Sequence, residues 1–587
     1  MSLNIIGISA HFHDAACCLL RDGKLVAAVQ EERFSRIKHD PTIPRAAFGY
    51  CLEQGGITIA DVDCVAYYED PVVKLDRQLW MGLPQLPSLA PEALFRLDPA
   101  RAEREIRELL GFEGEIQLVP HHLSHAASSF CFSGFDDAAI LVVDAVGEWA
   151  TTSLGRASGS SLEILDEVRF PDSLGLLYST ITSYLGFEVN DAEYKVMGLA
   201  PYGQPIYLDK LMQLVESLPN GKFRLNPEYF DFMRGRRMYS EALCDLLGAP
   251  PRAAESEIPQ FAKDVARSLQ VLLEKLLLQL ANHLHRIVPS QNLCMAGGVA
   301  LNCVANAAVL RDGPFDRLFV QPAAGDAGGA LGAAAMAHIT RSGQRPEVGR
   351  LEHVYLGPRY SSNEVAALLE ATPLAFADFR GRERELLATV ADRLADGKVI
   401  GWFHGGMEFG PRALGARSII ADPRRDEMRD RINALVKMRE AFRPFAPAVL
   451  AEAASAHFDL DHPSPFMLET CQVKSAIRLP AITHVDGSAR VQTVDAKVSP
   501  RFHALISEFG RRTGCPILLN TSFNLRGEPI VCSPMDALLC FLRSDIDFLV
   551  LEDFVIDRAG VPGAWTGWYR STGQSARAIS DIVYTLF

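Results

Sequence analysis

The pattern that most constrains the fold is a group of strands that occurs twice. Residues 4–8 form a short apolar run, and the strand-like runs Ala15–Arg21 and Lys24–Gln30 follow it, joined through Asp22-Gly23, a strong hairpin signal. A related arrangement returns at Ala138–Asp144, where an apolar run ends on an acid and two further strand-like runs follow. Each unit is therefore a strand, a short turn carrying polar residues and a return strand.

Such a repeat predicts an α/β fold whose N-terminal domain is internally duplicated, as in nucleotide-binding domains of the actin and sugar-kinase type. Residues 342–362 contain Gly, Pro and charges without periodicity, which places a domain boundary there. We predict one domain over residues 1–345 and a second α/β domain over 355–587. The sequence also predicts helices at 258–287, 328–338 and 426–438, and strands at 292–295, 399–403 and 517–519.

The composition is that of a multidomain soluble enzyme. The chain has 587 residues, which is too long for one hydrophobic core, and 48% of them are hydrophobic while 22% are charged. It contains no membrane-length apolar run and no signal-peptide pattern, so we expect a cytoplasmic protein. The net charge of −14 argues against a nucleic-acid partner. The 12 cysteines contain no Cys-x-x-Cys pair, which favours buried, reduced thiols.

A cluster of potential metal ligands begins at His121-His122-Leu-Ser-His125. On a helix, His121 and His125 project from one face, whereas His122 points elsewhere. The spacing alone is also compatible with two partly exposed helical histidines. Asp144 ends the next predicted strand, and Asp326 opens a Gly/Ala-rich helix. Two imidazoles and two carboxylates would form a mixed site suited to iron, manganese or zinc.

Gly297-Gly298 follows a predicted strand and opens a helix that includes Asn302. Paired glycines let the backbone approach a nucleotide, and a helix N-terminus favours its negative charge. Alone, the pair is more often a tight strand-to-helix turn. It gains weight beside Asp326, since a nucleotide and its metal ion need both features.

A basic stretch runs from residue 407 to 447, with nine Arg or Lys against six acids. Arg412 and Arg443 lie in apolar, proline-bounded sequence, so we expect both to be partly buried. A buried guanidinium needs an anion or a carboxylate partner. A structural ion pair could explain one arginine, whereas several together favour a phosphate-rich ligand. Asn520-Thr-Ser522-Phe-Asn524, after a strand, can bind phosphate or ribose, or simply cap a turn.

The combination resembles the nodulation-type and antibiotic O-carbamoyltransferases over nearly the whole chain. The matching motifs are His-Asp-Ala-Ala at 13–16, Glu-Glu-Arg-Phe-Ser-Arg-Ile-Lys-His at 31–39, His-His-x-x-His-Ala-Ala-Ser at 121–128, Glu-Tyr-Lys-Val-Met-Gly-Leu-Ala at 193–200, Glu-Phe-Gly-Pro-Arg-Ala-Leu-Gly at 408–415, Arg-Pro-Phe-Ala-Pro at 443–447 and Asn-Thr-Ser-Phe-Asn at 520–524. Motifs of this length in this order are very specific.

The resemblance implies an N-terminal domain like the threonylcarbamoyl-transferring tRNA-modification protein and a C-terminal YrdC-like domain. It also implies the chemistry. Carbamoyl phosphate is hydrolysed to carbamate, ATP with Mg²⁺ converts the carbamate to carbamoyl-adenylate, and the N-terminal domain passes the carbamoyl group to the hydroxyl of a small molecule.

Site residues are carried over by motif. The resemblance implies Fe(II) as the metal, held by His121, His125, Asp144 and Asp326. It implies a carbamoyl phosphate and ATP site made of Arg412, Lys437, Arg443, Arg490, Asn520 and Ser522. It places Lys38, Gly298 and Asn302, with Asn226 as a weaker match, around the adenylate, and His13 as the general base.

One stretch departs from the family. An arginine often precedes the Glu-Phe-Gly-Pro block, where this sequence has His404-Gly405-Gly406, so one phosphate contact has no counterpart. Residues 65–100 are aromatic, proline-rich and irregular, and we expect them to help shape the acceptor pocket. A homo-oligomer is compatible with the sequence.

Two other functions compete with this interpretation. A phosphotransferase of the sugar-kinase superfamily would convert ATP to ADP without carbamoyl phosphate, but it does not explain the arginine-rich second domain. A modifier of tRNA or of a hydrogenase-maturation partner would need a basic face or the zinc-finger Cys-x-x-Cys pairs, and the sequence has neither feature.

Overall fold

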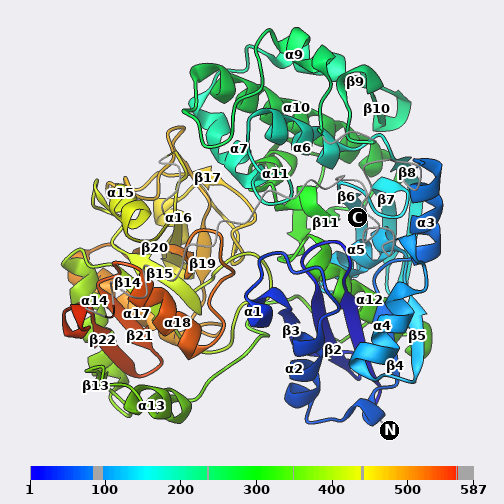
Figure 1. Ribbon diagram of the computed structural model, residues 1–587. Coiled ribbons are helices and arrows are strands. Elements are labelled where there is room, and N and C mark those ends of the chain that lie inside the picture. The colour runs from blue at the N-terminus through cyan, green and yellow to red at the C-terminus, as the bar shows by residue number, and fades with distance from the viewer. Residues whose placement is uncertain are drawn as a thin grey trace. The chain divides into compact units, whose positions relative to one another are not determined.

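The computed structural model describes residues 2–563 and 565, except 83–96, 234–236, 348 and 438–441, and only the backbone of Lys437 (Figure 1). The chain divides into two compact units. The first contains the residues up to Glu31 and His39–Leu351. The second contains residues 32–38 and the described residues from Glu352 to Trp565.

The first unit contains two five-stranded sheets with the same topology. Their strand orders are β3-β2-β1-β4-β5 and β12-β11-β6-β7-β8. In each sheet three consecutive strands form antiparallel hairpins and two later strands add in parallel. The strands are β1 (Asn4–Ser9), β2 (Ala16–Arg21), β3 (Lys24–Gln30), β4 (Cys64–Tyr67), β5 (Glu115–Leu118), β6 (Asp137–Val143), β7 (Ala150–Ser158), β8 (Ser161–Arg169), β11 (Asn292–Ala296) and β12 (Arg317–Val320). The predicted α/β class and internal duplication are confirmed.

Two helices at equivalent places in the repeat form the centre of this unit. Helix α5 (His121–Phe130) follows β5 yet packs on β6 and β11 of the other sheet, whereas α12 (Asp326–Ser342) follows β12 and packs on β1, β2 and β4. The two helices also pack on each other. A Cβ at Gly332 would lie 1.6 Å from the carbonyl oxygen of Ser124, so this close approach requires glycine. The crossing brings the N-termini of α5 and α12 together.

The remaining helices of the first unit surround this centre. The longest, α10, spans 28 residues because buried leucines such as Leu269, Leu273, Leu276 and Leu280 recur at helical spacing. No helix in the described part of the chain is long and apolar enough to cross a membrane. These elements are α2 (Arg45–Gly55), α3 (Pro71–Trp80), α4 (Arg101–Leu110), α6 (Leu174–Tyr184), α7 (Glu193–Leu199), α8 (Leu208–Leu211), α9 (Glu241–Leu247), α10 (Gln260–Ile287), α11 (Cys303–Asp312) and the strand pair β9 (Val215–Ser217) and β10 (Phe223–Leu225).

The second unit is built on an eight-stranded mixed sheet of order β13-β22-β21-β14-β15-β20-β16-β19. Its core contains the fully buried Trp402 and Phe403 of β14. The strands are β13 (Ala377–Asp378), β14 (Ile400–Phe403), β15 (Arg417–Ala421), β16 (Ala446–Leu450), β19 (Gln492–Val494), β20 (Ile517–Ser522), β21 (Phe548–Leu551) and β22 (Phe554–Asp557), beside the pair β17 (Cys471–Gln472) and β18 (Ser488–Ala489). The helices are α13 (Ser362–Glu370), α14 (Glu383–Ala395), α15 (Met428–Ile432), α16 (Ala454–His457), α17 (Pro500–Thr513) and α18 (Pro534–Arg543).

The predicted helix at 426–438 is shorter than expected. Asp426 pairs with Arg478 at 2.7 Å outside the helix, and α15 begins only at Met428. After Ile432 the chain widens into a π-helical turn, Asn433–Lys437.

Residues 32–38 are an N-terminal segment that packs with the second unit. They include the one-turn helix α1 (Glu32–Ser35). The buried guanidinium of Arg33 donates to the carbonyl of Gly410 at 2.7 Å, and Arg36 donates to the carbonyls of Pro529 and Ile530. The arginines of the 31–39 motif thus have a structural role, because they satisfy loop carbonyls of the second unit.

Candidate metal centre and anion-binding loop

Four buried side chains converge where α5 and α12 begin. His121 and His125 lie on one face of α5, Asp144 directly follows β6, and Asp326 is the first residue of α12. His121 Nε2 lies 3.0 Å from His125 Nε2 and 3.1 Å from Asp144 Oδ2. Asp326 Oδ1 lies 3.7 Å from His121 Nε2 and 3.5 Å from His125 Nε2. All four ligand atoms lie within 4.8 Å of one another.

These separations fit a bound metal ion. Bonds of about 2.0–2.2 Å in a tetrahedral site place ligand atoms about 3.3–3.6 Å apart, and the distances here are 3.0–3.7 Å. Two carboxylates beside two imidazole nitrogens that face each other favour a positive charge between them, which a shared metal ion or a proton on an imidazole can supply. The alternative of two partly exposed histidines is wrong, since both imidazoles are buried. The donor set, two nitrogens and two oxygens, suits iron, manganese or zinc.

The electrostatics of the cluster favour a positive charge at its centre. Burial opposes the imidazolium of His125, but hydrogen bonds and the charges of Asp144 and Asp326 raise its pKa to about 9. Burial would raise the pKa of Asp144, yet His121 and His125 hold it well below its usual range. In both cases the site stabilises a cation between the carboxylates, which a metal ion supplies without protons.

Neighbouring groups that the sequence did not reveal hold the ligands in place. Glu148 Oε1 accepts the backbone N–H of His121 at 2.8 Å, and the hydroxyl of Tyr68 donates to Asp326 Oδ2 at 3.4 Å. His122 turns away, as predicted, and its Nδ1 contacts Ser153 Oγ at 2.7 Å. The signal in the sequence that could have indicated Glu148 is its position, four residues after the predicted ligand Asp144.

In the second unit one carboxylate folds the basic loop that contains Arg412. Buried Glu408 accepts the backbone N–H groups of Leu414, Ala416 and Arg417 at 2.7, 2.8 and 3.2 Å through a single oxygen, Oε1. This closes residues 408–417 into a compact loop with Arg412 near its middle. A charge-assisted acceptor for three N–H groups is strong, so the loop is well fixed.

Asn520 of β20 lies where four chain segments meet. Its Nδ2 donates to the carbonyl of Ala413 at 3.2 Å and to Gln492 Oε1 at 2.8 Å, and in the sheet it pairs with Ala446. Along the sequence, Arg412 directly precedes Ala413, Arg490 lies two residues before Gln492 and Arg443 lies three residues before Ala446. Ser522 lies two residues further along β20. Asn520 Oδ1 has no hydrogen-bond partner among the described residues. These segments are far apart in sequence. Arg412 and Arg443 are partly buried as expected, and their binding of an anion stays a prediction.

Comparison with known proteins identifies the family. The family description "Carbamoyltransferase N-terminus" matches residues 4–83 and 102–335, and "Carbamoyltransferase C-terminus" matches residues 391–558. The chain belongs to the carbamoyltransferase family. It is 42% identical to Nodulation protein NolNO of Sinorhizobium fredii over 94% of this chain and 80% of that protein. It is 30% identical to Nodulation protein U of Rhizobium tropici over 88% of this chain and 90% of that protein.

Other similar proteins add context. An uncharacterized protein of Synechocystis, sll1178, is 45% identical over 95% of this chain and 97% of its own length. The crystal structure of T. kodakarensis HypF aligns with a TM-score of 0.32 at 14% identity, covering 60% of this chain and 50% of HypF. A ROK hexokinase from Thermus thermophilus aligns with a TM-score of 0.28 at 15% identity over 57% of this chain and 98% of the hexokinase.

The other predicted site residues of this carbamoyltransferase have defined places. The backbone N–H of Gly298 donates to Asp144 Oδ1 at 2.8 Å, which puts the Gly-Gly turn beside the metal centre. Asn302 caps α11 and pairs with Gln270, and Asn226 caps a one-turn 3₁₀ helix at Pro227–Tyr229. These caps satisfy backbone donors, so contacts of Asn302 and Asn226 with an adenylate stay predictions.

The last predictions concern His13, Lys38, Lys437 and the segment 65–100. His13 lies in the loop between β1 and β2 of the first unit, and Lys38 is grouped with the second unit. The role of Lys38 beside Gly298 stays a prediction. The side chain of Lys437 lies outside the described residues, as does most of the 65–100 segment beyond α3.

Arg417, by contrast, supports the fold. It is fully buried, its guanidinium lies 3.6 Å from the ring centre of Phe403, and it donates to the carbonyls of Pro358 and Gly405 at 2.8 and 3.0 Å. A guanidinium surrounded by carbonyls and an aromatic face is satisfied without a ligand.

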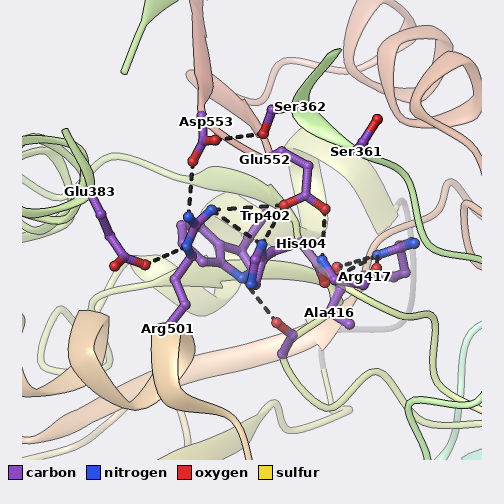
Figure 2. A network of polar contacts seen from close by, with 12 residues as sticks. Ser361, Ser362, Glu383, Trp402, His404, Ala416, Arg417, Arg501, Glu552 and Asp553 are labelled. Carbon is purple, nitrogen blue, oxygen red and sulfur yellow. Dashed lines mark hydrogen bonds and ion pairs between the residues drawn. The ribbon is translucent and has the colours of Figure 1, made fainter. Parts of the chain in front are cut away.

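The stretch that departs from the family pattern borders a cavity of about 320 Å³. Figure 2 shows the ion pairs at its wall. His404 Nδ1 lies 2.5 Å from Glu552 Oε2 and 3.3 Å from Nη1 of Arg501, which belongs to α17. The same guanidinium contacts Glu383 at 2.7 Å and Asp553 at 2.9 Å. Residues 404–406 are thus fixed by carboxylates and by an arginine from a distant segment.

Glu408→Ala is expected to destabilise the second unit by about 3–5 kcal/mol, because three N–H groups lose one buried acceptor. Urea unfolding with a probe in this unit measures the change. The matched control is Glu427→Ala, whose side chain is 66% exposed and lies 3.9 Å from Arg425, with an expected change of about 0.5 kcal/mol or less. Equal midpoints for the two variants would show that the loop does not depend on Glu408.

Proposed function

We propose that this carbamoyltransferase is an ATP-dependent O-carbamoyltransferase that uses its two units for successive half-reactions. In the second unit, carbamoyl phosphate is hydrolysed to carbamate and phosphate, and carbamate attacks the α-phosphate of ATP, giving carbamoyl-adenylate and pyrophosphate. In the first unit, a hydroxyl of a small natural product or sugar attacks the carbamoyl carbon and AMP leaves. Mg²⁺ would accompany ATP, as it does for nucleotide substrates generally.

The observation that supports this division is that each unit has its own polar site. The four candidate metal ligands all belong to the first unit, whereas the segments that contain Arg412, Arg443 and Arg490 meet at Asn520 in the second. A site rich in guanidinium groups neutralises phosphate charge as pyrophosphate leaves. Asn520 Oδ1, which has no hydrogen-bond partner among the described residues, would add a neutral contact to the substrates.

The chain's own residues account for the transfer step. An alcohol is a poor nucleophile at neutral pH, and a nearby imidazole such as His13 can accept its proton. The backbone N–H of Gly298 donates to Asp144 and holds the Gly-Gly turn beside the metal centre, where we propose that the adenylate binds. When bound by His121, His125, Asp144 and Asp326, an iron, manganese or zinc ion would polarise the carbamoyl oxygen, and we propose Fe(II).

The competing functions predict different products. A sugar-kinase-like enzyme would release ADP, but the loop built on Glu408 and the meeting point at Asn520 then have no use. A tRNA-modifying enzyme would need a basic surface, whereas the net charge is −14. We therefore propose a small-molecule acceptor, no nucleic-acid partner and a cytoplasmic location. The proposal is compatible with a homo-oligomer.

Pyrophosphate release tests the adenylation half. Without acceptor, the enzyme should release pyrophosphate from ATP only when carbamoyl phosphate is present, because carbamate is the attacking nucleophile. Release is measured by a coupled pyrophosphate assay with and without carbamoyl phosphate. ADP in place of pyrophosphate would reject adenylation and favour a kinase. A panel of sugars, polyols and other hydroxylated metabolites, read by the mass gain of one carbamoyl group, then tests the acceptor class.

A further inference from the structure

Four titratable side chains form a chain of hydrogen bonds that ends at His13. His13 Nδ1 lies 2.9 Å from Asp14 Oδ2, and the other oxygen of Asp14 lies 2.8 Å from His39 Nδ1. His39 Nε2 lies 3.1 Å from Asp191 Oδ1. The order is therefore Asp191, His39, Asp14, His13. These residues come from three of the motifs in the sequence or stand directly beside them, so the chain of contacts joins segments about 150 residues apart.

The same segments are also held together through the backbone. The N–H of His11 donates to the carbonyl of Pro41 at 2.7 Å, and the N–H of Ala15 donates to the carbonyl of Asp40 at 3.0 Å. Residues 39–41 thus lie along the loop between β1 and β2. His11 and Asp14 have φ values of 72° and 57°, which non-glycine residues seldom adopt, so the loop is fixed in a strained conformation by these contacts.

The hydrogen-bond pattern defines which ring nitrogen of His13 can act as a base. Each Asp14 oxygen receives one Nδ1–H, and His39 can satisfy two carboxylates only by donating from both ring nitrogens. This leaves His13 with its Nδ1 as the donor and its Nε2 as the basic atom. No described residue hydrogen-bonds His13 Nε2, and the His13 side chain is 24% exposed. Asp326 of α12 and Glu193 of α7 lie near enough to act on His13 electrostatically.

We propose that Asp14 is a positioning residue for carbamoyl transfer, fixed by His39 and Asp191, which holds His13 with Nε2 directed to the acceptor hydroxyl. The inference deepens the proposed O-carbamoyl transfer and depends on it. A carboxylate that accepts a hydrogen bond from the far nitrogen of an imidazole fixes its tautomer and stabilises the imidazolium that forms. Asp14 is well suited to this, because its second oxygen is already bound by His39 and cannot rotate away.

Carbamoyl transfer forms one bond to the carbamoyl carbon and breaks another. The hydroxyl oxygen of the acceptor forms a bond to the carbamoyl carbon while its proton moves to His13 Nε2. The bond between the carbamoyl carbon and the phosphate oxygen of AMP breaks, and AMP leaves with the electron pair. His13 becomes an imidazolium whose Nδ1–H faces Asp14, and it later releases the proton to water.

A second metal ion is the alternative occupant of this cluster, because His13, Asp14 and His39 could each offer one ligand atom. Three observations favour the hydrogen-bond chain. The ring nitrogens of His39 each face a different carboxylate, Asp14 is shared by both imidazoles, and all four side chains are 20–30% exposed. The buried cluster at His121 has none of these features.

The test compares two nucleophiles. Carbamoyl-adenylate is supplied directly, with either the most active alcohol of the panel or hydroxylamine as acceptor. An alcohol must lose its proton as it attacks, whereas hydroxylamine attacks through a lone pair that is already available. Asp14→Asn should lower kcat for the alcohol by about 10- to 10³-fold with KM nearly unchanged, but lower the hydroxylamine rate by less than about threefold. His39→Gln and Asp191→Asn should show the same selectivity with smaller losses.

The pH profile provides a readout that a merely structural role would not change. Burial opposes the charged form of His13, but Asp14 outweighs burial and raises the pKa of His13 above its ordinary value. Removing the carboxylate lowers that pKa, so His13 becomes a free base at lower pH. The acidic limb of the kcat profile should therefore shift to lower pH in Asp14→Asn and stay in place in Asp209→Asn, an exposed residue of α8.

Metal content shows whether the first unit of each variant is still correctly folded. All variants should bind the same amount of metal as the wild type. If Asp14→Asn loses one metal equivalent, the cluster is a second metal site and the proposal is rejected. Equal losses for the alcohol and hydroxylamine, or an unchanged pH limb, would also overturn it. If the wild type transfers to neither nucleophile from carbamoyl-adenylate, it is the proposed function that fails.

Discussion

His121→Ala and Asp326→Ala should each lose the bound metal ion and lower carbamoyl transfer by about 10³-fold or more, since a Lewis acid contributes several kcal/mol to charge stabilisation. Each change removes one of four ligands from a buried cluster whose remaining carboxylate and imidazole charges no longer balance. Pyrophosphate release in the presence of carbamoyl phosphate should continue, because its residues lie in the second unit. Elemental analysis of the purified variants measures the metal.

The chain offers a close control on the same helix. His122 is as buried as His121 but points to Ser153. His122→Asn keeps a polar atom near Ser153, and it should retain both metal and transfer. Unchanged metal content in His121→Ala and Asp326→Ala would reject the four-ligand site. Loss of metal with normal transfer would show that the ion is structural and that the acceptor is activated by other residues.

The elements of the fold could be predicted because the local signals agree with the tertiary structure. The hairpin at Asp22-Gly23 joins β2 and β3, and the recurrence of a strand ending on Asp144 corresponds to the second sheet. The leucine spacing in α10 gave the long helix almost to the residue. These signals come from hydrogen bonding and burial among residues within about 30 positions of one another, so they can be recognised in the sequence itself.

Contacts between distant segments could not be predicted from spacing. The crossing of α5 and α12 onto opposite sheets brings Asp326 to His121, and no pattern in either helix specifies it. Glu408 appears in the sequence as one of six acids in a stretch with nine basic residues, yet its carboxylate folds the Arg412 loop. Asp191 has no signal of its own, because its partner His39 lies about 150 residues away. The helix after Asp426 shows the same limit, since it begins only at Met428 and changes to a π-helical turn after Ile432.

Arg443→Ala and His13→Ala are expected to fail in opposite half-reactions. Removing the Arg443 guanidinium eliminates a charge-assisted contact worth about 1.5–3 kcal/mol, so adenylation should fall by about 10- to 150-fold. Transfer from supplied carbamoyl-adenylate should remain nearly intact. His13→Ala should leave pyrophosphate release unchanged and slow transfer to an alcohol by about 10²- to 10⁴-fold, as expected for loss of a general base.

Each variant is the control for the other, because a general folding defect would impair both half-reactions. Synthetic carbamoyl-adenylate supplied with the acceptor distinguishes them. It should rescue product formation by Arg443→Ala and not by His13→Ala, since only the former lacks the intermediate. Equal failure of the two variants would mean that the anion site and the metal centre are not separable. Rescue of both would place the base elsewhere in the first unit, and it would remove the reason for the chain of contacts from Asp191 to His13.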